Sequence, residues 1–452
     1  MYNQLKMKSL KKQFDLITFA LQHKYQLIFI TLLIIHIFFR FYQLFVRANL
    51  GWDQIDSAWA AKEILVDKHF LLQGPVAKGN SGIYMGPLYY YLNAIFYFFT
   101  NLDPIASPIF VAVASIVNTL ILFVITKKLF NWPIALIALF INTFSFFVIG
   151  IDRVQSAYYF IVPISYLIFY FLYKAISGEP KNLIYLAISV GLSFHIDFTS
   201  VFYPIIILFT LPFIPFNKKT FKYVLISIFV FLILLTPTLI NELKSSNSVS
   251  SGMLNYLQVN YHGIHITRIL QITHDAFITF EQILQFTFFR PLVYLFLPLF
   301  MIVYSLKKSN SNNKKRILKN FFQTIKLKLD FTKDKLLLFY LMILWTVIPW
   351  LILSTYSGEL TSYYFGLPRD FNIAILAYLT YLLIQQKLII LKLAVIVFWG
   401  YFALSSTQSF FKYGRGDLLA IEQSVRIAID NKQVIQFKDH DAASYVYYIY
   451  TR

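Results

Sequence analysis

Two carboxylates stand close together in a short polar stretch, Gly51-Trp52-Asp53-Gln54-Ile55-Asp56. A spacing of three residues places Asp53 and Asp56 on one face of a helix that starts at Asp53. Such a pair suits a general base, a metal ion or a cationic group. The alternative is structural, because Asp favours the first turn of a helix and Asp53 would then cap a helix running from Ala58 to Leu65. Spacing alone leaves both interpretations open.

A second candidate group follows in the stretch 78–82, between the breaks Gly74-Pro75 and Gly86-Pro87. Lys78 is a cation suited to holding a phosphate. The second break opens the run Leu88-Tyr89-Tyr90-Tyr91-Leu92, which predicts an aromatic amphipathic helix in the lipid headgroup region. The tyrosines alone would equally suit an interfacial aromatic belt.

Metal and thiol chemistry have little support in the remaining residues. The chain has no cysteine, which excludes disulfides, thiolate metal sites and cysteine nucleophiles. His262, His265 and His274 recur at no ligand spacing, so a solvated surface is favoured over a metal site there.

The elements that position these residues must be membrane helices. Of the 452 residues, 58% are hydrophobic and only 13% charged, about half the charge of a soluble protein. A bilayer core of roughly 30 Å needs about 20 apolar residues per helix. Eleven candidate spans result, near 26–46, 105–126, 132–150, 158–174, 183–196, 198–215, 221–240, 286–306, 336–355, 370–386 and 388–406. The fifth and sixth either meet in a short surface turn or form one broken helix.

The distribution of the net charge of +19 indicates how the chain is oriented in the membrane. With the N-terminus inside, segments 1–25, 127–131, 174–182, 216–222, 307–335 and 387–392 carry 24 Lys and Arg against four acids. The basic N-terminus (1–25) and the basic loop 307–335 are therefore predicted to be cytoplasmic, next to anionic lipid. Because the charge is spread between apolar runs, nucleic-acid binding is not expected.

Three segments on the predicted outer side are too long for simple connections, namely 47–104, 241–285 and 407–452. We expect them to be functional and the transmembrane domain to cover 26–406. In the tail, Leu418, Ile421, Val425 and Ala428 recur at helical spacing after Asp417, and 434–437 reads as a strand. The tail is thus predicted to be a small α/β appendage that leans on the membrane domain or its loops.

The order of these motifs resembles the polyprenyl-phosphate-sugar-dependent glycosyltransferases of the GT-C superfamily. The motifs are the acidic pair after the first span, then Gly86-Pro87-Leu88-Tyr89-Tyr90-Tyr91-Leu92, then a span ending Lys127-Lys128-Leu129-Phe130. Within the superfamily, the chain is most similar to the family of protein O-mannosyltransferases and the lipid A aminoarabinose transferase, in a prokaryotic branch of family 39. The similarity covers about residues 26–205. It implies an all-α polytopic membrane protein of about 11 transmembrane helices.

The resemblance assigns roles to particular acids. Asp53 matches the family's catalytic aspartate in the first outer loop, which acts as base or positions the acceptor. Many relatives have Asp-Glu there, so Gln54 is a departure. Asp56 then supplies the second carboxylate, which leaves a divalent metal open as a cofactor. Asp152 occupies the short second outer loop, where relatives place another acid facing the same cavity.

The resemblance also implies donor-binding residues. Arg153, beside Asp152, would pair with the donor phosphate, as would Lys78 and Arg369. His195 matches a frequent His at the outer end of the fifth span, with a hydrogen-bonded interhelical histidine as the alternative. Further substrate contacts are assigned to Tyr89 and to the penultimate outer loop with Glu359 and Tyr364, which lacks the family's His.

The function implied is a hexosyl- or pentosyltransferase of the cell membrane. It would move a sugar from a polyprenyl-phosphate donor to a lipid, glycan or protein acceptor on the extracytoplasmic face, with inversion. The alternatives are a transporter or flippase of lipid-linked sugars, and an O-antigen-type polymerase or ligase. Against a transporter, no internal repeat or matching pair of broken spans is found. Against a polymerase, acids rather than bases lie nearest the membrane on the outer side.

Overall fold

The computed structural model describes residues 22–77, 83–215, 217–244, 249–261, 263, 266–284, 333–358, 364, 366–412, 414, 416–431 and 446–447. These residues are mostly helical and contain two isolated β-bridges, Val76 with Tyr84 and Tyr261 with Tyr356. Four described helices are long and apolar enough to cross a membrane, or five if one bent pair forms a single span. The protein is therefore a polytopic membrane protein with a helical fold.

The helices of the first half follow the order of the predicted spans. They are α2 (Lys24–Phe41), α3 (Leu44–Arg47), α4 (Trp52–Leu65), α5 (Leu88–Phe99), α6 (Ala106–Leu129), α7 (Trp132–Phe144), α8 (Phe146–Ile151), α9 (Ile161–Ile176), α10 (Asn182–Ser193) and α11 (Phe202–Thr210). Short 3₁₀ turns η1 (Ala157–Phe160), η2 (Phe198–Val201) and η3 (Leu211–Phe213) adjoin α9 and α11. The fifth and sixth predicted spans are thus two helices separated by a turn.

The second half is less continuous. It contains α12 (Lys218–Leu234), α13 (Thr236–Lys244), α14 (Val249–Asn260), α15 (Ile266–Leu284), α18 (Lys333–Leu353), α19 (Arg369–Ile384), α20 (Ile389–Lys412) and α21 (Leu418–Asp430). The predicted span 286–306, most of the basic loop 307–335 and the predicted strand 434–437 lie outside the described residues. Each of the other ten predicted spans overlaps described helices, while the count of eleven stays a prediction.

Capping side chains explain where several helices begin. Asn131 and Asn217 cap α7 and α12 by accepting from the N–H groups of Ile134 (3.0 Å) and Thr220 (2.9 Å). Lys127 and Lys128 lie in the last turn of α6, where the helix dipole favours cations. Polar residues in the short connections therefore set the ends of the apolar helices.

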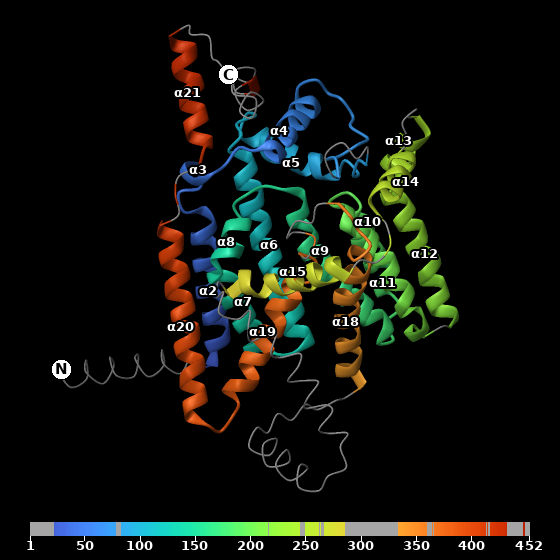
Figure 1. Ribbon diagram of the computed structural model, residues 1–452, viewed down its shortest axis with the longest axis vertical. Helices are drawn as coiled ribbons and strands as arrows, with labels where there is room; N and C mark the ends of the chain where they lie inside the picture. The colour runs from blue at the N-terminus through green and yellow to red at the C-terminus, as the bar shows by residue number, and fades with distance from the viewer. Residues whose placement is uncertain are drawn as a thin grey trace, which may run out of the picture.

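The main hydrophobic core lies between α6, α7, α9, α10, α18 and α19. The outward surfaces of α12 and α20 remain apolar and uncovered; exposed side chains there include Phe229 and Val397. Large apolar faces of this kind suit contact with lipid. Figure 1 shows α2, α6, α12, α18 and α20 running roughly along the long axis, with α4, α5 and α21 gathered at one end.

The helix α15 does not follow the long axis and crosses the front of the view between α8 and α18 (Figure 1). Its middle and its C-terminal end are bonded to different elements. Ser145 Oγ donates to the Ile283 carbonyl at 2.7 Å, and Trp350 Nε1 donates to Thr273 Oγ1 at 3.0 Å. Because α15 contacts both α8 and α18, it bridges the two halves of the helical layer.

The 47–104 segment, here called the first loop, folds as α4 and α5 packed together. The predicted amphipathic helix is present as α5: Tyr89 and Tyr90 are buried, whereas Ile95, Phe98 and Phe99 are exposed. The buried tyrosines are therefore part of the protein core rather than of an interfacial belt.

The expected helix after Asp417 is present as α21, and Leu418, Ile421 and Val425 are buried against residues of the first loop and α3. The described part of the tail is therefore a helix that packs on the first loop.

Candidate functional site

The acidic pair of the first loop lies on α4, which begins at Trp52. Gly51 is the N-cap, and its N–H donates to Gln54 Oε1 at 2.7 Å, so Asp53 is a first-turn residue rather than the cap. Asp53 and Asp56 are both exposed. Ser156 Oγ donates to Asp53 Oδ2 at 2.6 Å. The Asp53 carboxylate is thus oriented by one hydroxyl and remains accessible to a reactant.

Asp56 has a different environment. Its carboxylate accepts a short hydrogen bond from the Tyr90 hydroxyl. Although one side of Asp56 is exposed, the surrounding protein atoms hinder solvation of the carboxylate and raise its pKa above the ordinary value. The Tyr90 hydrogen bond opposes this shift, and the charge of Asp53 adds to it. Asp56 therefore holds its proton more tightly than an aspartate in solution does.

Gln155 connects the first loop to the short segment after α8. Its Nε2 donates to Ser57 Oγ at 3.0 Å and to the Tyr89 hydroxyl, while its Oε1 accepts from Ser107 Oγ at 2.7 Å. Its main-chain carbonyl accepts from Gln54 Nε2. Gln155 is 1% exposed, so this network is dry and fixes α4, α5 and α6 relative to one another.

Next in the site, Arg40 and Asp152 form a pair of buried charged side chains. Arg40, fully buried at the end of α2, donates from Nε (3.0 Å) and Nη2 (2.8 Å) to Asp152 Oδ2. Its Nη1 and Nη2 also donate to the carbonyls of Thr143 and Asn142, each at 2.9 Å. A buried charge is costly unless it is paired in this way. Asp152 therefore neutralises Arg40, which the sequence did not anticipate.

Arg153 points away from the pocket described below. Its Nη1 donates to the carbonyls of Phe39 (2.9 Å) and Arg40 (3.0 Å) at the end of α2. Carbonyls at a helix C-terminus lack intrahelical partners, so Arg153 closes that end of α2. These bonds direct the Nη1 group of Arg153 toward α2.

Arg369 and Asp370 form a second buried pair at the start of α19, with Nε and Oδ1 separated by 3.7 Å. The Asn118 amide, with its nitrogen toward the acid, donates to Asp370 Oδ2 at 3.0 Å and accepts from Arg369 Nη2 at 2.9 Å. Arg369 is only 4% exposed, yet its Nε and Nη1 make no hydrogen bond within the described part of the chain. Buried donors without partners are rare and costly.

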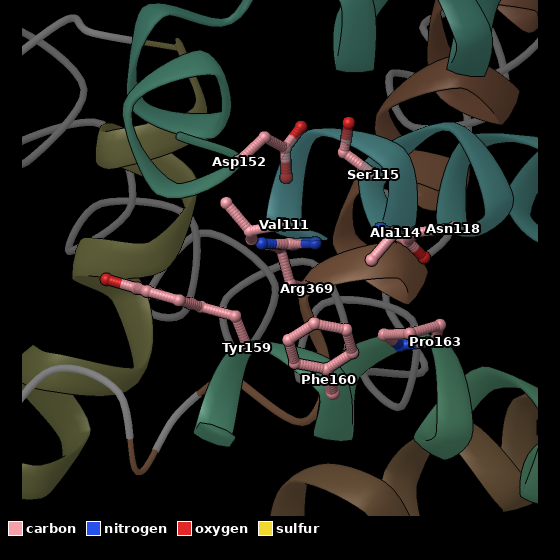
Figure 2. A pocket seen from close by; sticks show the side chains of 9 residues that line it. All are labelled: Val111, Ala114, Ser115, Asn118, Asp152, Tyr159, Phe160, Pro163 and Arg369. Atoms are coloured by element: carbon pink, nitrogen blue, oxygen red, sulfur yellow. The ribbon is translucent and has the colours of Figure 1, made fainter. Parts of the chain in front are cut away.

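Arg369 borders a pocket between α6, α9, α19 and the segment after α8. The pocket holds about 260 Å³ of empty space, partly open to solvent, and Figure 2 shows the Arg369 guanidinium extending toward Asp152. Tyr159 and Phe160 lie on the other side of the guanidinium (Figure 2). The complete lining is Val111, Ala114, Ser115, Asn118, Asp152, Tyr159, Phe160, Pro163 and Arg369.

The pocket combines apolar walls with two charged side chains, Asp152 and Arg369. Guanidinium N–H groups bind phosphate oxygens through charge-assisted hydrogen bonds, which strengthen where water is excluded. The segment 152–160 contributes Asp152, Tyr159 and Phe160 to the pocket and Ser156 to Asp53. One short segment therefore borders the pocket and also contacts the accessible carboxylate.

Several predicted residues lie elsewhere. His195 Nε2 lies 2.8 Å from the Leu234 carbonyl, which matches the interhelical alternative, and the His195 ring fills the space beside Gly86. Tyr89 is buried in the Gln155 network. Tyr364 packs on Tyr356, with ring centroids 6.2 Å apart. Lys78 and Glu359 lie outside the described residues. The structure thus groups Asp53 with Asp56, and Asp152 with Arg369.

No cluster of three or more His, Asp or Glu side chains suited to a metal occurs among the described residues. Sequence reasoning missed Arg40, Asn118, Gln155 and Asp370. An available signal was the cost of charge in an apolar segment, because Arg40 interrupts the first predicted span and Asp370 begins another. Gln155 and Asn118 gave no such signal, since uncharged polar residues are common in helical membrane proteins.

Comparison with known proteins identifies related folds. Residues 85–240 match the family model described as dolichyl-phosphate-mannose-protein mannosyltransferase. A comparison with curated sequences gave no significant match. Asp53 lies before the matched region, so this match does not test the role expected for Asp53.

Two solved structures share the fold. ArnT from Cupriavidus metallidurans, bound to undecaprenyl phosphate, matches with a TM-score of 0.57 and 11% identity over 95% of this chain and 85% of that one. The Archaeoglobus fulgidus oligosaccharyltransferase, tethered to an acceptor peptide, gives 0.55 and 12% over 96% of this chain and 59% of the other. The fold is that of GT-C glycosyltransferases, which confirms the resemblance expected from the sequence.

Proposed function

We propose that the protein is a membrane glycosyltransferase that moves a sugar from a polyprenyl-phosphate donor to a hydroxyl of a lipid, glycan or protein acceptor. The GT-C fold supports this class, as do a relative bound to undecaprenyl phosphate and a matching family named for dolichyl-phosphate mannose. The basic inner segments support a cell-membrane enzyme with a cytoplasmic N-terminus and an extracytoplasmic site.

The observation that carries the proposal is that Nε and Nη1 of Arg369 make no hydrogen bond within the described residues, beside a pocket with apolar walls. A lipid-linked phosphate offers oxygens for Arg369 Nε and Nη1, and its prenyl chain suits apolar surfaces such as Val111 and Phe160. Of the three cations predicted to bind phosphate, Arg369 has the support of an adjoining pocket. Arg153 has its Nη1 bonded to α2, and Lys78 is not described.

The proposed reaction is a single displacement. Asp53 accepts the proton of the acceptor hydroxyl as the acceptor oxygen bonds to the anomeric carbon of the sugar. The bond from that carbon to the phosphate oxygen breaks, and the polyprenyl phosphate leaves as an anion stabilised by Arg369. Attack opposite the leaving group inverts the anomeric configuration. Ser156 orients the Asp53 carboxylate through its hydroxyl.

The decisive experiment is transfer in detergent micelles. Micelles have no two sides, so product formation requires chemistry, whereas a flippase gives none. Purified protein is incubated with radiolabelled dolichyl-phosphate mannose or an undecaprenyl-phosphate-linked sugar, and with solubilised membrane extract as acceptor source. We expect label to leave the donor lipid and to enter an acceptor fraction. Intact donor under all conditions would contradict the proposal.

The variant Asp53→Asn tests the base. We expect it to remain folded and to lose transfer by about 10²- to 10⁴-fold, because general-base catalysis contributes that much. Asp67→Asn is the matched control, since Asp67 follows the same helix but pairs with Lys62 at the surface, 2.8 Å away. Transfer by Asp53→Asn at the wild-type rate would refute the assignment of Asp53.

A further inference from the structure

Residues 416–418, which follow α20, are hydrogen-bonded to residues 46–50 at the start of the first loop. This contact is here called the strap. The N–H of Gly416 donates to the Val46 carbonyl (3.0 Å), and that of Leu418 to the Ala48 carbonyl (3.1 Å). The two segments therefore run side by side in the same direction. At the end of this contact, Asp417 Oδ1 accepts from the Leu50 N–H at 2.7 Å. Leu50 directly precedes Gly51, the N-cap of α4.

The strap is closely packed. A Cβ on Gly416 would lie 1.9 Å from the Ala48 carbonyl oxygen, so only glycine permits this approach. Arg47 continues the contact toward α20 by donating to the Phe410 carbonyl at 2.8 Å and stacking over its ring. The strap thus holds residues 46–50 over a stretch of backbone rather than at one point.

Beyond the strap, α21 packs against α3 and belongs to the same hydrophobic cluster as part of α4. Leu418, Ile421 and Val425 share one hydrophobic cluster with Ile55 and Ala58 of α4. Later in the chain, Tyr447 is fully buried in the same cluster, and its hydroxyl donates to the Leu102 carbonyl at 2.9 Å. One hydrophobic cluster therefore contains both the face of α4 that carries Ile55 and Ala58 and chain that follows the last described span.

We propose that this C-terminal segment is a positioning element for the reaction and that Asp417 is its positioning residue. The inference rests on the proposed function, in which Asp53 is the base. Asp53 lies three residues after Leu50, in the first turn of α4, so the hydrogen bond to Leu50 fixes where that turn starts. A small displacement of a reacting group lowers the rate strongly without removing the group.

Besides the Gln155 network, two contacts act on the position of Asp53. Asp417 holds the backbone before α4, and Ser156, from the segment that borders the pocket, holds the carboxylate itself. Without the hydrogen bond from Leu50 to Asp417, the first turn of α4 can shift, while Ser156 still holds the Asp53 side chain. The distance from Asp53 to the acceptor then varies, whereas the Arg369 pocket, formed by other helices, is unchanged.

The test compares Asp417→Ala, which removes the acceptor of the Leu50 N–H, with Asp417→Asn, which keeps an acceptor oxygen. With dolichyl-phosphate mannose in micelles, we expect Asp417→Ala to lower kcat about tenfold at an unchanged donor KM. Asp417→Asn should restore kcat to within about threefold of wild type. Tyr447→Phe is the control, because it removes a hydrogen bond from the same cluster, away from Leu50.

A second measurement separates this inference from the proposed function. Amide hydrogen exchange of residues 50–57 should be faster in Asp417→Ala than in wild type, Asp417→Asn and Tyr447→Phe. If wild type transfers no sugar, the proposed function fails while the exchange result still decides whether Asp417 fixes α4. Wild-type kcat and exchange in Asp417→Ala would overturn the inference. Equal losses in the Ala and Asn variants, or a change in donor KM alone, would do so too.

Discussion

Asp53 and Asp152 are both aspartates that the sequence assigned to one catalytic cavity, yet they occupy opposite environments. Asp53 is exposed on α4, and a neutral hydroxyl contacts it. Asp152 is 5% exposed, and the fully buried Arg40 donates to it twice. The hydrogen bonds of Asp152 are thus made to a buried cation within the protein, whereas the carboxylate of Asp53 remains open to a reactant. The accessible acid is therefore the better candidate for a base.

The same contrast holds for the cations. The Nη1 of Arg153 bonds to two backbone carbonyls, whereas two nitrogens of Arg369 make no hydrogen bond within the described residues. Position beside a predicted loop therefore did not distinguish an arginine bonded to backbone carbonyls from one whose nitrogens are in part without such partners in the described part of the chain. The difference lies in whether the hydrogen-bonding capacity of the side chain is used within the protein.

The largest expected effect concerns the buried acid. Asp152→Asn leaves Arg40 buried without a countercharge, which should lower the free energy of unfolding by about 3–5 kcal/mol. We expect a clearly lower melting temperature in detergent, in contrast to Asp53→Asn, which should melt as wild type does. Equal melting temperatures for the two variants would break the comparison between the structural and the catalytic acid.

A substitution in the uncharged hydrogen-bond network around Gln155 should have an intermediate effect. Gln155→Ala leaves the hydroxyls of Ser57, Tyr89 and Ser107 short of partners, at a cost of about 1–3 kcal/mol. We expect both a lower melting temperature and a reduced kcat, since α4 loses its link to Ser107 on α6. Thermal melts and transfer assays on one preparation measure both. A loss of stability with full turnover would show that the network does not position α4.

A smaller effect is expected for a substitution of Arg369. Arg369→Lys keeps a positive charge beside Asp370 but loses the planar fork, so donor affinity should fall about tenfold, or roughly 1.4 kcal/mol. The melting temperature should change little. Binding of undecaprenyl phosphate, titrated in micelles, measures the affinity. Arg426→Lys is the control at an exposed arginine that pairs with Glu422, and equal affinity in both variants would argue against a phosphate at Arg369.

The smallest effect concerns protonation within the acidic pair. The pKa of Asp56 is raised by hindered solvation, so the folded protein holds this proton more tightly than the unfolded chain does. Its contribution to stability is therefore present at low pH and is lost as the pH rises through the folded pKa. Tyr90→Phe removes a donor to the carboxylate and should raise this pKa further.

Carboxyl ¹³C shifts in protein labelled at aspartate measure this pKa. Tyr91→Phe is the matched control, because the Tyr91 hydroxyl bonds to the Leu71 carbonyl and not to an acid. A downward shift in Tyr90→Phe would contradict the hydrogen bond as the stabiliser of the charged form.

The helical ladder and the GT-C fold were predictable because long apolar runs and the order of motifs are local properties of the sequence. α4 was predictable for the same reason, since Asp53 and Asp56 share a face with helical spacing. The helix after Asp417 followed from its periodicity.

The contacts that assign roles were not predictable from one sequence. Arg40 and Asp152 are 112 residues apart, and Leu50 and Asp417 are 367 apart, so no spacing relates them. Arg369 and Asp370 are adjacent, yet which of their atoms remain unpaired depends on Asn118 of another helix. The pattern of residue types in the sequence locates candidate site residues. The contacts that each side chain makes in the fold decide which of these residues are free to react.

Gly86 illustrates a separate consequence for mutational studies. A Cβ at this position would lie 1.9 Å from His195 Nδ1, and the Gly86 N–H bonds to the Phe194 carbonyl at 3.1 Å. The first loop and the turn after α10 therefore meet with no space for a side chain. A screen that scores only activity would rank Gly86 among essential positions, although its contribution is the volume that it leaves empty.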